Sequence, residues 1–207
     1  AYIYINDNEK KHFNDNNYFF LVGAIAYYPC DLIGSSKVLA ERIEPQTLAL
    51  SYNKLDVLLF HLLNNSIYVP NDATTNIHDN SYISSFIDQY NRLMTEGIEA
   101  DYDMINSFRD EIYSQIDFRD IFFIDALLAI YILKTEYSIF SILPMHSSIS
   151  KESLVNIVKS NHFVRELWPS QRIMCENGLF NGKSGVIQMP TGAGKTKALS
   201  IAIYSSF

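Results

Sequence analysis

The stretch Gly185-Val-Ile-Gln-Met-Pro-Thr-Gly-Ala-Gly-Lys-Thr-Lys-Ala-Leu-Ser-Ile-Ala-Ile203 joins a short apolar run to a Gly-rich turn and then to a segment with the apolar spacing of a helix. This order predicts a strand, a phosphate-binding loop and a helix. Gly192 and Gly194 permit backbone conformations that a Cβ atom would forbid, and they bring N–H groups close to a polyphosphate. The N-terminus of the following helix points at the same anion.

The side chains of this turn predict a site for ATP with Mg²⁺. Lys195 is expected to neutralise the β- and γ-phosphates, and the Thr196 hydroxyl is expected to be an oxygen ligand of the nucleotide-bound Mg²⁺. We therefore predict that Lys195 and Thr196 are catalytic. Four further residues are expected to wrap the phosphates: Thr191, Gly192, Ala193 and Gly194.

Met189 stands where the general Walker A pattern G-x-x-x-x-G-K-[ST] has its first glycine, so that pattern is matched only from Gly194 onward. The loop Pro190-Thr-Gly-Ala-Gly-Lys-Thr196 instead resembles motif I of superfamily 2 (DEAD/DEAH-box) helicases, which commonly reads x-P-T-G-x-G-K-T. This resemblance implies a RecA-like α/β domain, ATP hydrolysis and a nucleic-acid substrate. The alternative is a chance Gly/Lys turn on a globular surface.

A second element lies 24 residues before Lys195, where Leu167-Trp-Pro-Ser-Gln171 is similar to the L-x-P-x-Q element upstream of motif I in many such helicases. The resemblance implies that Gln171 reads the adenine edge. Trp168 and Ser170 replace the Arg and the aromatic residue that relatives often carry. The alternative is a Pro-terminated turn whose Gln only caps a helix.

The motifs that such a motor needs for hydrolysis are missing from the 207 residues. Superfamily 2 helicases use an acidic Asp-Glu box for Mg²⁺ and water, and an arginine finger from a second RecA-like domain. Only eleven residues follow Thr196, and none is Asp, Glu or Arg. We therefore expect the sequence to be the leading part of a larger helicase, and this part alone not to hydrolyse ATP.

Charge is divided unevenly along the chain. Residues 1–150 hold nine basic and twenty acidic residues, a net charge of −11, whereas residues 151–207 hold seven basic and three acidic ones, a net charge of +4. Because nucleic-acid tracks are basic, the first part is a poor candidate for one and suits a protein partner better. With 48% hydrophobic residues the chain can bury a substantial core.

The composition excludes several other classes. Cys30 and Cys175 lie far apart, without C-x-x-C spacing, and are expected to be buried thiols of a reducing compartment. The opening residues 1–5 run at once into polar residues, so no secretory signal is evident. No uncharged apolar run reaches the roughly 18 residues that a membrane span requires. These observations together predict a cytoplasmic protein with no membrane contact.

Apolar spacing predicts a mostly α fold: a helical accessory or interaction domain over residues 1–150, followed by the start of a RecA-like domain over residues 151–207. The division is placed at residues 144–150, where Pro144 ends the last core helix and a serine cluster follows. Asp31 is expected to cap the second helix. Helices are predicted over residues 18–28, 31–44, 48–64, 81–97, 101–116, 117–143, 151–161 and 172–177, and a strand over residues 1–5.

A looser resemblance covers residues 21–40, Leu21-Val-Gly-Ala-Ile-Ala-Tyr-Tyr-Pro-Cys-Asp-Leu-Ile-Gly-Ser-Ser-Lys-Val-Leu-Ala40. This stretch is similar to a helical N-terminal region of DEAD/DEAH-box helicases from bacterial antiphage defence systems, Hachiman among them. The resemblance implies a subunit that engages DNA rather than RNA, and a helical domain that contacts an effector nuclease.

Two rival interpretations stay open at this point. The same loop occurs in other ATPase classes, such as a restriction-type translocase or a signalling ATPase, to which a helical interaction module would be attached. In the second rival, the helical domain is a protein-interaction scaffold and the nucleotide site is vestigial. Residues 190–196 fit all three interpretations.

Overall fold

The computed structural model describes residues 16–44, 54–69, 81–114, 118–160, 163–190 and 192–205. Over these ranges the chain forms ten α-helices and no strand. The predicted mostly α class is therefore confirmed for the described part, in which no RecA-like α/β portion is seen. The strand predicted at residues 1–5 lies outside the described residues.

In chain order the helices are α2 (Asn16–Tyr27), α3 (Ile33–Ala40), α5 (Lys54–Asn64), α6 (Ser81–Glu96), α7 (Tyr102–Tyr113), α8 (Phe118–Glu136), α9 (Ile139–His146), α10 (Lys151–Ser160), α11 (Pro169–Glu176) and α12 (Lys195–Ser205). Helices α2, α6, α7 and α10 keep close to the predicted ranges, whereas α3 is shorter than the predicted 31–44 and α11 begins before the predicted residue 172. Residues 48–53 of the predicted helix 48–64 lie outside the described residues.

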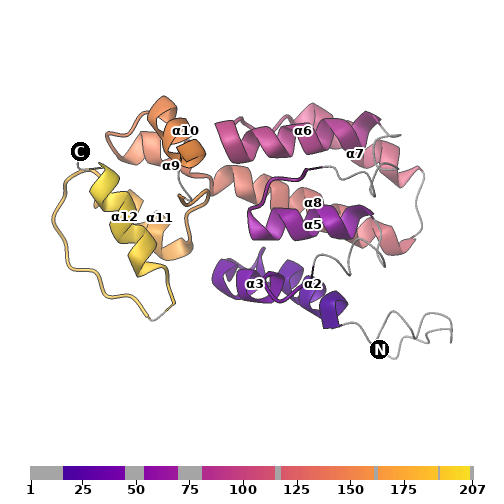
Figure 1. The fold of residues 1–207 in the computed structure, drawn as a ribbon, viewed down its shortest axis with the longest axis horizontal. Helices are drawn as coiled ribbons and strands as arrows, with labels where there is room; N and C mark the ends of the chain where they lie inside the picture. The colour runs from indigo at the N-terminus through magenta and orange to yellow at the C-terminus, as the bar shows by residue number, and fades with distance from the viewer. Residues whose placement is uncertain are drawn as a thin grey trace.

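The first six helices pack in pairs, and the pairs stack as three layers (Figure 1). The pair α6 and α7 forms one outer layer, α5 and α8 form the middle layer, and α2 and α3 form the other outer layer. Helices α9, α10, α11 and α12 gather at one end of this stack, and α9 contacts α8, α10 and α11. We call the stack of α2 to α8 the helical body.

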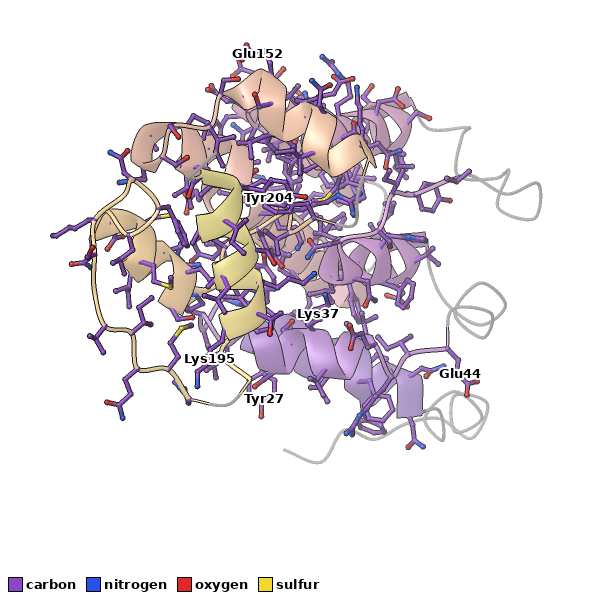
Figure 2. The ribbon with its side chains drawn as sticks, turned by 60° about the vertical axis from the view of Figure 1, so that its left-hand side comes forward. Tyr27, Lys37, Glu44, Glu152, Lys195 and Tyr204 are labelled. Atoms are coloured by element: carbon purple, nitrogen blue, oxygen red, sulfur yellow. The ribbon has the colours of Figure 1, made fainter. Side chains whose placement is uncertain are left out.

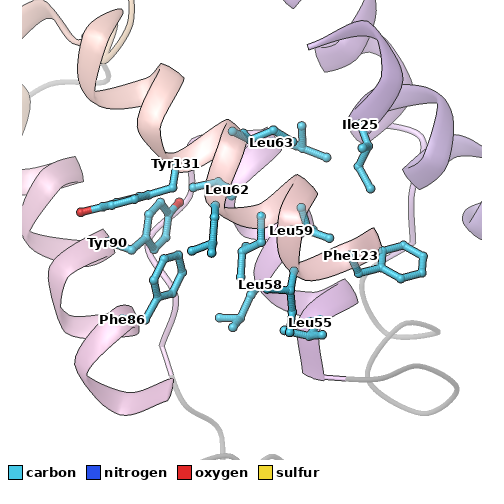
Figure 3. Packing of buried hydrophobic residues seen from close by; sticks show 14 of the residues in the cluster. Ile25, Leu55, Leu58, Leu59, Leu62, Leu63, Phe86, Tyr90, Phe123 and Tyr131 are labelled. Carbon is cyan, nitrogen blue, oxygen red and sulfur yellow. The ribbon is translucent and has the colours of Figure 1, made fainter. Parts of the chain in front are cut away.

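Helix α5 supplies the centre of the helical body. Its leucines recur at helical spacing on one face, and each is at most 4% exposed: Leu55, Leu58, Leu59, Leu62 and Leu63. Figure 3 shows this stripe between Ile25 of α2, Phe86 and Tyr90 of α6, and Phe123 of α8. An apolar stripe of this kind stabilises a helix mainly through the packing partners that cover it.

The single helix predicted over residues 117–143 is wrong, because the chain breaks between α8 and α9. The backbone N–H of Leu167 donates to Tyr137 C=O at 2.8 Å, and the N–H of Ile139 donates to Arg165 C=O at 3.2 Å. Ser138 then caps α9 by accepting a hydrogen bond from the Phe140 N–H. A distant segment has therefore taken backbone groups that a continuous helix would need.

Three smaller predictions also fail. Asp31 does not cap α3; it adopts φ +62° in the turn after α2, and Leu32 precedes the first helical residue. Cys30, expected to be buried, is exposed, whereas Cys175 is buried as predicted. Pro144 lies inside α9, which ends at His146, because a proline near the end of a helix removes only one late hydrogen bond.

The buried apolar residues form two clusters. One runs from Leu21 to Tyr131 within the helical body, and the other runs from Ile139 to Ile201 among the C-terminal helices. Helix α9 belongs to the second cluster. The predicted division at residue 150 stays a prediction.

None of the described helices is long and apolar enough to cross a membrane.

Gly97 tests how α6 is joined to the second cluster. It ends α6 with φ +63°, and a Cβ atom there would lie 2.1 Å from Cγ of Phe140. We expect Gly97→Ala to lower the free energy of unfolding by well over the roughly 1–2 kcal/mol that a left-handed conformation alone costs an L-residue. Urea unfolding measures this.

Gly182→Ala is the matched control, because Gly182 has φ +76° and no atom within 4 Å of an added Cβ. Its cost should stay within the conformational term. Equal losses in the two variants would show that Gly97 and Phe140 are not in contact.

Candidate nucleotide site

The predicted strand before the loop is wrong within the described residues. Residues 185–190 have no regular secondary structure, and the one β-bridge described joins Ser138 and Glu166. Val186 is fully exposed and Ile187 is 43% exposed. A strand needs neighbours to satisfy its backbone groups, and no described segment pairs with this one.

The glycine turn itself has the predicted backbone character. Gly192 and Gly194 both adopt φ +83°, in the region that L-residues with a Cβ rarely occupy. The Ala193 N–H donates to Pro190 C=O at 3.3 Å, so the chain forms a turn directly before α12. Thr191, predicted to join the phosphate wrap, lies outside the described residues.

Helix α12 begins at Lys195, immediately after the turn. Its first described backbone bond runs from the Ala198 N–H to Gly194 C=O at 3.0 Å. The N–H groups of the three preceding residues therefore have no partner within the helix, as at any helix N-terminus. Lys195 (Figure 2) and Thr196 are both exposed there, which leaves the ammonium and hydroxyl groups accessible to a ligand.

Gln171 lies close to the loop but is buried, with 2% of its surface exposed. Its Oε1 accepts the Trp168 N–H at 2.9 Å, so it caps the start of α11, and its Nε2 donates to Gly194 C=O at 3.2 Å. These bonds use both ends of the amide on the backbone. The capping alternative is thus what the geometry displays, and the adenine-reading role stays a prediction.

Ser170 makes a second link between α11 and the loop. Its hydroxyl donates to Ala193 C=O at 2.9 Å. A Cβ atom on Gly194 would lie 2.7 Å from Nε2 of Gln171, so the backbone approaches α11 as closely as a glycine allows. The structure therefore brings the Leu167–Gln171 element and the loop together across 23 residues of chain, through contacts of Ser170 and Gln171.

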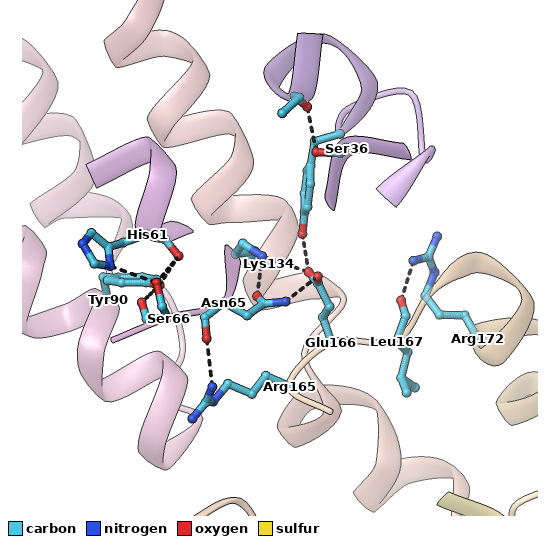
Figure 4. A network of polar contacts seen from close by, with 12 residues as sticks. Ser36, His61, Asn65, Ser66, Tyr90, Lys134, Arg165, Glu166, Leu167 and Arg172 are labelled. Atoms are coloured by element: carbon cyan, nitrogen blue, oxygen red, sulfur yellow. Dashed lines mark hydrogen bonds and ion pairs between the residues drawn. The ribbon is translucent and has the colours of Figure 1, made fainter. Parts of the chain in front are cut away.

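Upstream of α11, Glu166 is buried inside the helical body and binds three side chains (Figure 4). Its carboxylate accepts the Tyr28 hydroxyl at 2.5 Å, the Lys134 ammonium at 3.0 Å and the Asn65 amide at 2.8 Å. Lys134 also donates to Oδ1 of Asn65 at 2.6 Å. We call these four residues the Glu166 cluster; they come from the end of α2, the end of α5, α8 and the segment before α11.

The two charges of the Glu166 cluster, on Glu166 and Lys134, compensate each other. Burial alone would raise the pKa of Glu166, but the Lys134 charge and the hydrogen bonds outweigh burial and hold that pKa below its usual value. Burial lowers the pKa of Lys134, against the attraction of Glu166. Burial, together with the negative charge of Glu166, raises the pKa of Tyr28 well above its usual value, so its hydroxyl stays a donor.

Two arginines, one before and one after Glu166, also bind the C-terminal part of the chain to the helical body. Arg165 donates to the C=O groups of Met94 and Asn65, at 3.1 and 2.8 Å. Arg172 binds both carboxylate oxygens of Asp31, at 2.6 and 2.7 Å, and its guanidinium lies 3.8 Å from the centroid of the Tyr137 ring. Both bonds to Asp31 come from Nη2 of Arg172, and together with the stacking on Tyr137 they fix the position of this guanidinium.

A pocket of about 420 Å³ lies between the helical body and the loop. Lys37 and Val38 of α3 line one side, and Gly194 and Lys197 line another. Trp168, together with parts of the Glu166 cluster, lines the space between them. Lys195 and Thr196 are not among its lining residues.

The described residues contain no group of three His, Cys, Asp or Glu side chains that could hold a metal ion. Thr196, the one predicted metal contact, is exposed, and its role toward Mg²⁺ carried by the nucleotide stays a prediction.

Comparisons with protein-family models, with curated proteins and with solved structures found no match to this chain.

Sequence reasoning missed the Glu166 cluster entirely. Its four members lie as far apart as Tyr28 and Glu166, and none belongs to a recognised motif. One signal was present: Lys134 follows a long apolar run in α8, where a charge is costly unless it is paired. That signal predicts a buried partner but does not say which residue it is.

Glu166→Gln tests the cluster directly. Removing one charge of a buried pair leaves the other uncompensated, which costs about 3–5 kcal/mol. We expect the free energy of unfolding at pH 7 to fall by about this amount, measured by urea unfolding. The double variant Glu166→Gln with Lys134→Met should recover part of the loss, since no lone charge remains.

The pH dependence of the same proteins is the control. Because the pKa of Glu166 is lower in the folded chain than in the unfolded one, its contribution is complete above the unfolded value of 4.5 and is lost as the pH falls through the folded value. The native chain should therefore lose stability more steeply below pH 4.5 than Glu166→Gln does. Parallel curves would show that Glu166 is not held as a carboxylate.

Proposed function

We propose that residues 163–205 are the nucleotide-binding start of a superfamily 2 helicase or translocase that uses ATP with Mg²⁺. The observation that carries the proposal is the turn of Gly192 and Gly194, which is followed at once by a helix whose first residues expose an ammonium and a hydroxyl. Backbone N–H groups, Lys195 and Thr196 then converge on one anion, as polyphosphate binding requires.

The surface around the loop supports an α/β setting for it. Val186 and Ile187 before the turn, and Leu199 and Ile203 on α12, are all exposed apolar side chains. Neighbouring strands of a RecA-like domain would cover them and would give residues 185–190 their missing partners. The acidic box and the arginine finger of the motor would belong to such additional chain, with nucleic acid as the substrate and DNA favoured over RNA.

The helical body then serves as an accessory domain. Its acidic charge suits a protein partner better than a nucleic-acid track. By its resemblance to antiphage helicases, that partner is an effector nuclease in the bacterial cytoplasm.

One observation favours a second candidate function, an interaction scaffold with a vestigial nucleotide site. Both ends of the Gln171 amide are hydrogen-bonded to backbone groups, so this side chain ties the loop to α11. In this second candidate function the loop only connects α12 to α11, and the helical body binds a partner protein.

Lys195→Ala separates the two functions. A charged hydrogen bond to phosphate contributes about 1.5–3 kcal/mol, so the variant should bind Mg-ATP about 10- to 100-fold more weakly by isothermal titration calorimetry. Lys159→Ala, which removes an equally exposed lysine from α10, should bind as the native protein does. Equal affinity in all three proteins, or no binding in any, would reject the nucleotide site and leave the scaffold.

A further inference from the structure

The pocket beside the loop is not explained by the phosphate-loop motif of residues 190–196. It is bounded by Gly194 and Lys197 on one side and by Lys37 and Val38 of α3 on another. The first two residues lie in or directly after the proposed phosphate loop. A ligand whose phosphates lie on the loop therefore has an open space next to it, and α3 forms the far wall of that space.

The size and lining of this space suit a nucleoside. Its volume of about 420 Å³ lies within the roughly 300–1,000 Å³ usual for small-molecule sites. Trp168 supplies an aromatic surface, and Asn64, Asn65 and Gln171 line the pocket with amide groups that are already hydrogen-bonded within the chain. Such sites combine apolar or aromatic lining with a few polar groups that fix the orientation of the ligand.

The floor of the pocket is rigid before any ligand arrives. Trp168 lies against α3, since a Cβ atom on Gly34 would be only 3.3 Å from its ring. Glu166 is held by the Glu166 cluster, and Gln171 by its two backbone bonds. A preformed site of this kind spends little binding energy on ordering its own side chains.

Charge at the pocket favours an anionic ligand. Glu166 is neutralised by Lys134, so the floor carries no net negative charge. Lys37 and its partner Glu41 both line the pocket, 3.8 Å apart, and both side chains are more than a third exposed. Arg165 is a further basic lining residue, so basic side chains outnumber acidic ones at the pocket. Exposed pairs of this type contribute little, so Lys37 is available to a ligand. Lys197 adds a second ammonium group, from α12.

We propose that α3 is the second wall of the nucleotide site, with the nucleoside part of a nucleoside triphosphate in this pocket and its phosphates on the loop. This inference rests on the proposed function and goes beyond it, because it adds Lys37 and Val38 of the helical body to the binding residues. A bound nucleotide then bridges α3 and α12, and the helical body responds to nucleotide occupancy.

Val38→Trp tests the proposal in the intact protein. Val38 is 52% exposed, so a larger side chain there extends into the pocket without entering the core. We expect the variant to bind Mg-ATP at least about tenfold more weakly, because the space for the nucleoside is filled. Inorganic tripolyphosphate with Mg²⁺, which needs only the loop, should bind to within about twofold of the native protein.

Ser35→Trp is the matched control, an equally bulky change at an exposed position of α3 that does not line the pocket. It should leave the binding of both ligands unchanged. Lys37→Met gives a second measurement that does not depend on added bulk, and it should weaken Mg-ATP about tenfold.

The outcomes separate the two proposals. Native Mg-ATP affinity in both Val38→Trp and Lys37→Met, with Lys195→Ala still weakened, would overturn the α3 wall and leave the loop assignment standing. Absence of binding by both Mg-ATP and tripolyphosphate in the native protein would overturn the proposed function, and the α3 wall with it.

Discussion

The buried ion pair between Glu166 and Lys134 is the interaction on which the rest of the structure depends. Taking two charges out of water costs several kcal/mol for each ion, and only close partners offset that cost. Here the carboxylate has three donors and the ammonium has two acceptors, drawn from the residues that directly follow α2 and α5, from α8 and from the segment before α11. The pair can form only when these four elements are in place together, so it selects one arrangement of the helical body.

This arrangement also sets the position of the loop. Glu166 lies beside the backbone bridge that separates α8 from α9, and five residues later Gln171 holds Gly194. The path from the buried charge to the glycine turn is thus short, with a backbone bridge at one end and a hydrogen bond from the Gln171 side chain to the Gly194 carbonyl at the other. A loop attached in this way moves with the helical body. A ligand in the pocket between α3 and the loop can therefore contact the helical body and the loop at the same time.

Local features of the chain were predictable from the sequence. The leucine stripe of α5 follows helical spacing, and the Asp101 side chain caps α7 by accepting the Met104 N–H. The glycine turn was predicted because positive φ at Gly192 and Gly194 is a local property of glycine. In each case the residues that decide the structure are neighbours in the chain.

Features that depend on distant partners were not predictable. Asp31 has the chemistry of a helix cap, but its carboxylate binds Arg172, 141 residues away. The break at Ser138 follows from pairing with residues 165–167, and nothing near Ser138 in the sequence announces it. The predicted strand failed for the same physical reason, because an apolar run becomes a strand only when another segment pairs with it.

Amide hydrogen exchange at Leu167 and Ile139 tests the central claim most directly. Their N–H groups form the backbone bridge beside Glu166, which joins the segment carrying the loop to the helical body. If the ion pair holds that junction, both amides should exchange as slowly as those at the centre of α8, which open only with global unfolding. Exchange at the rate of an open chain, with α8 still protected, would show that the loop segment is not fixed to the body.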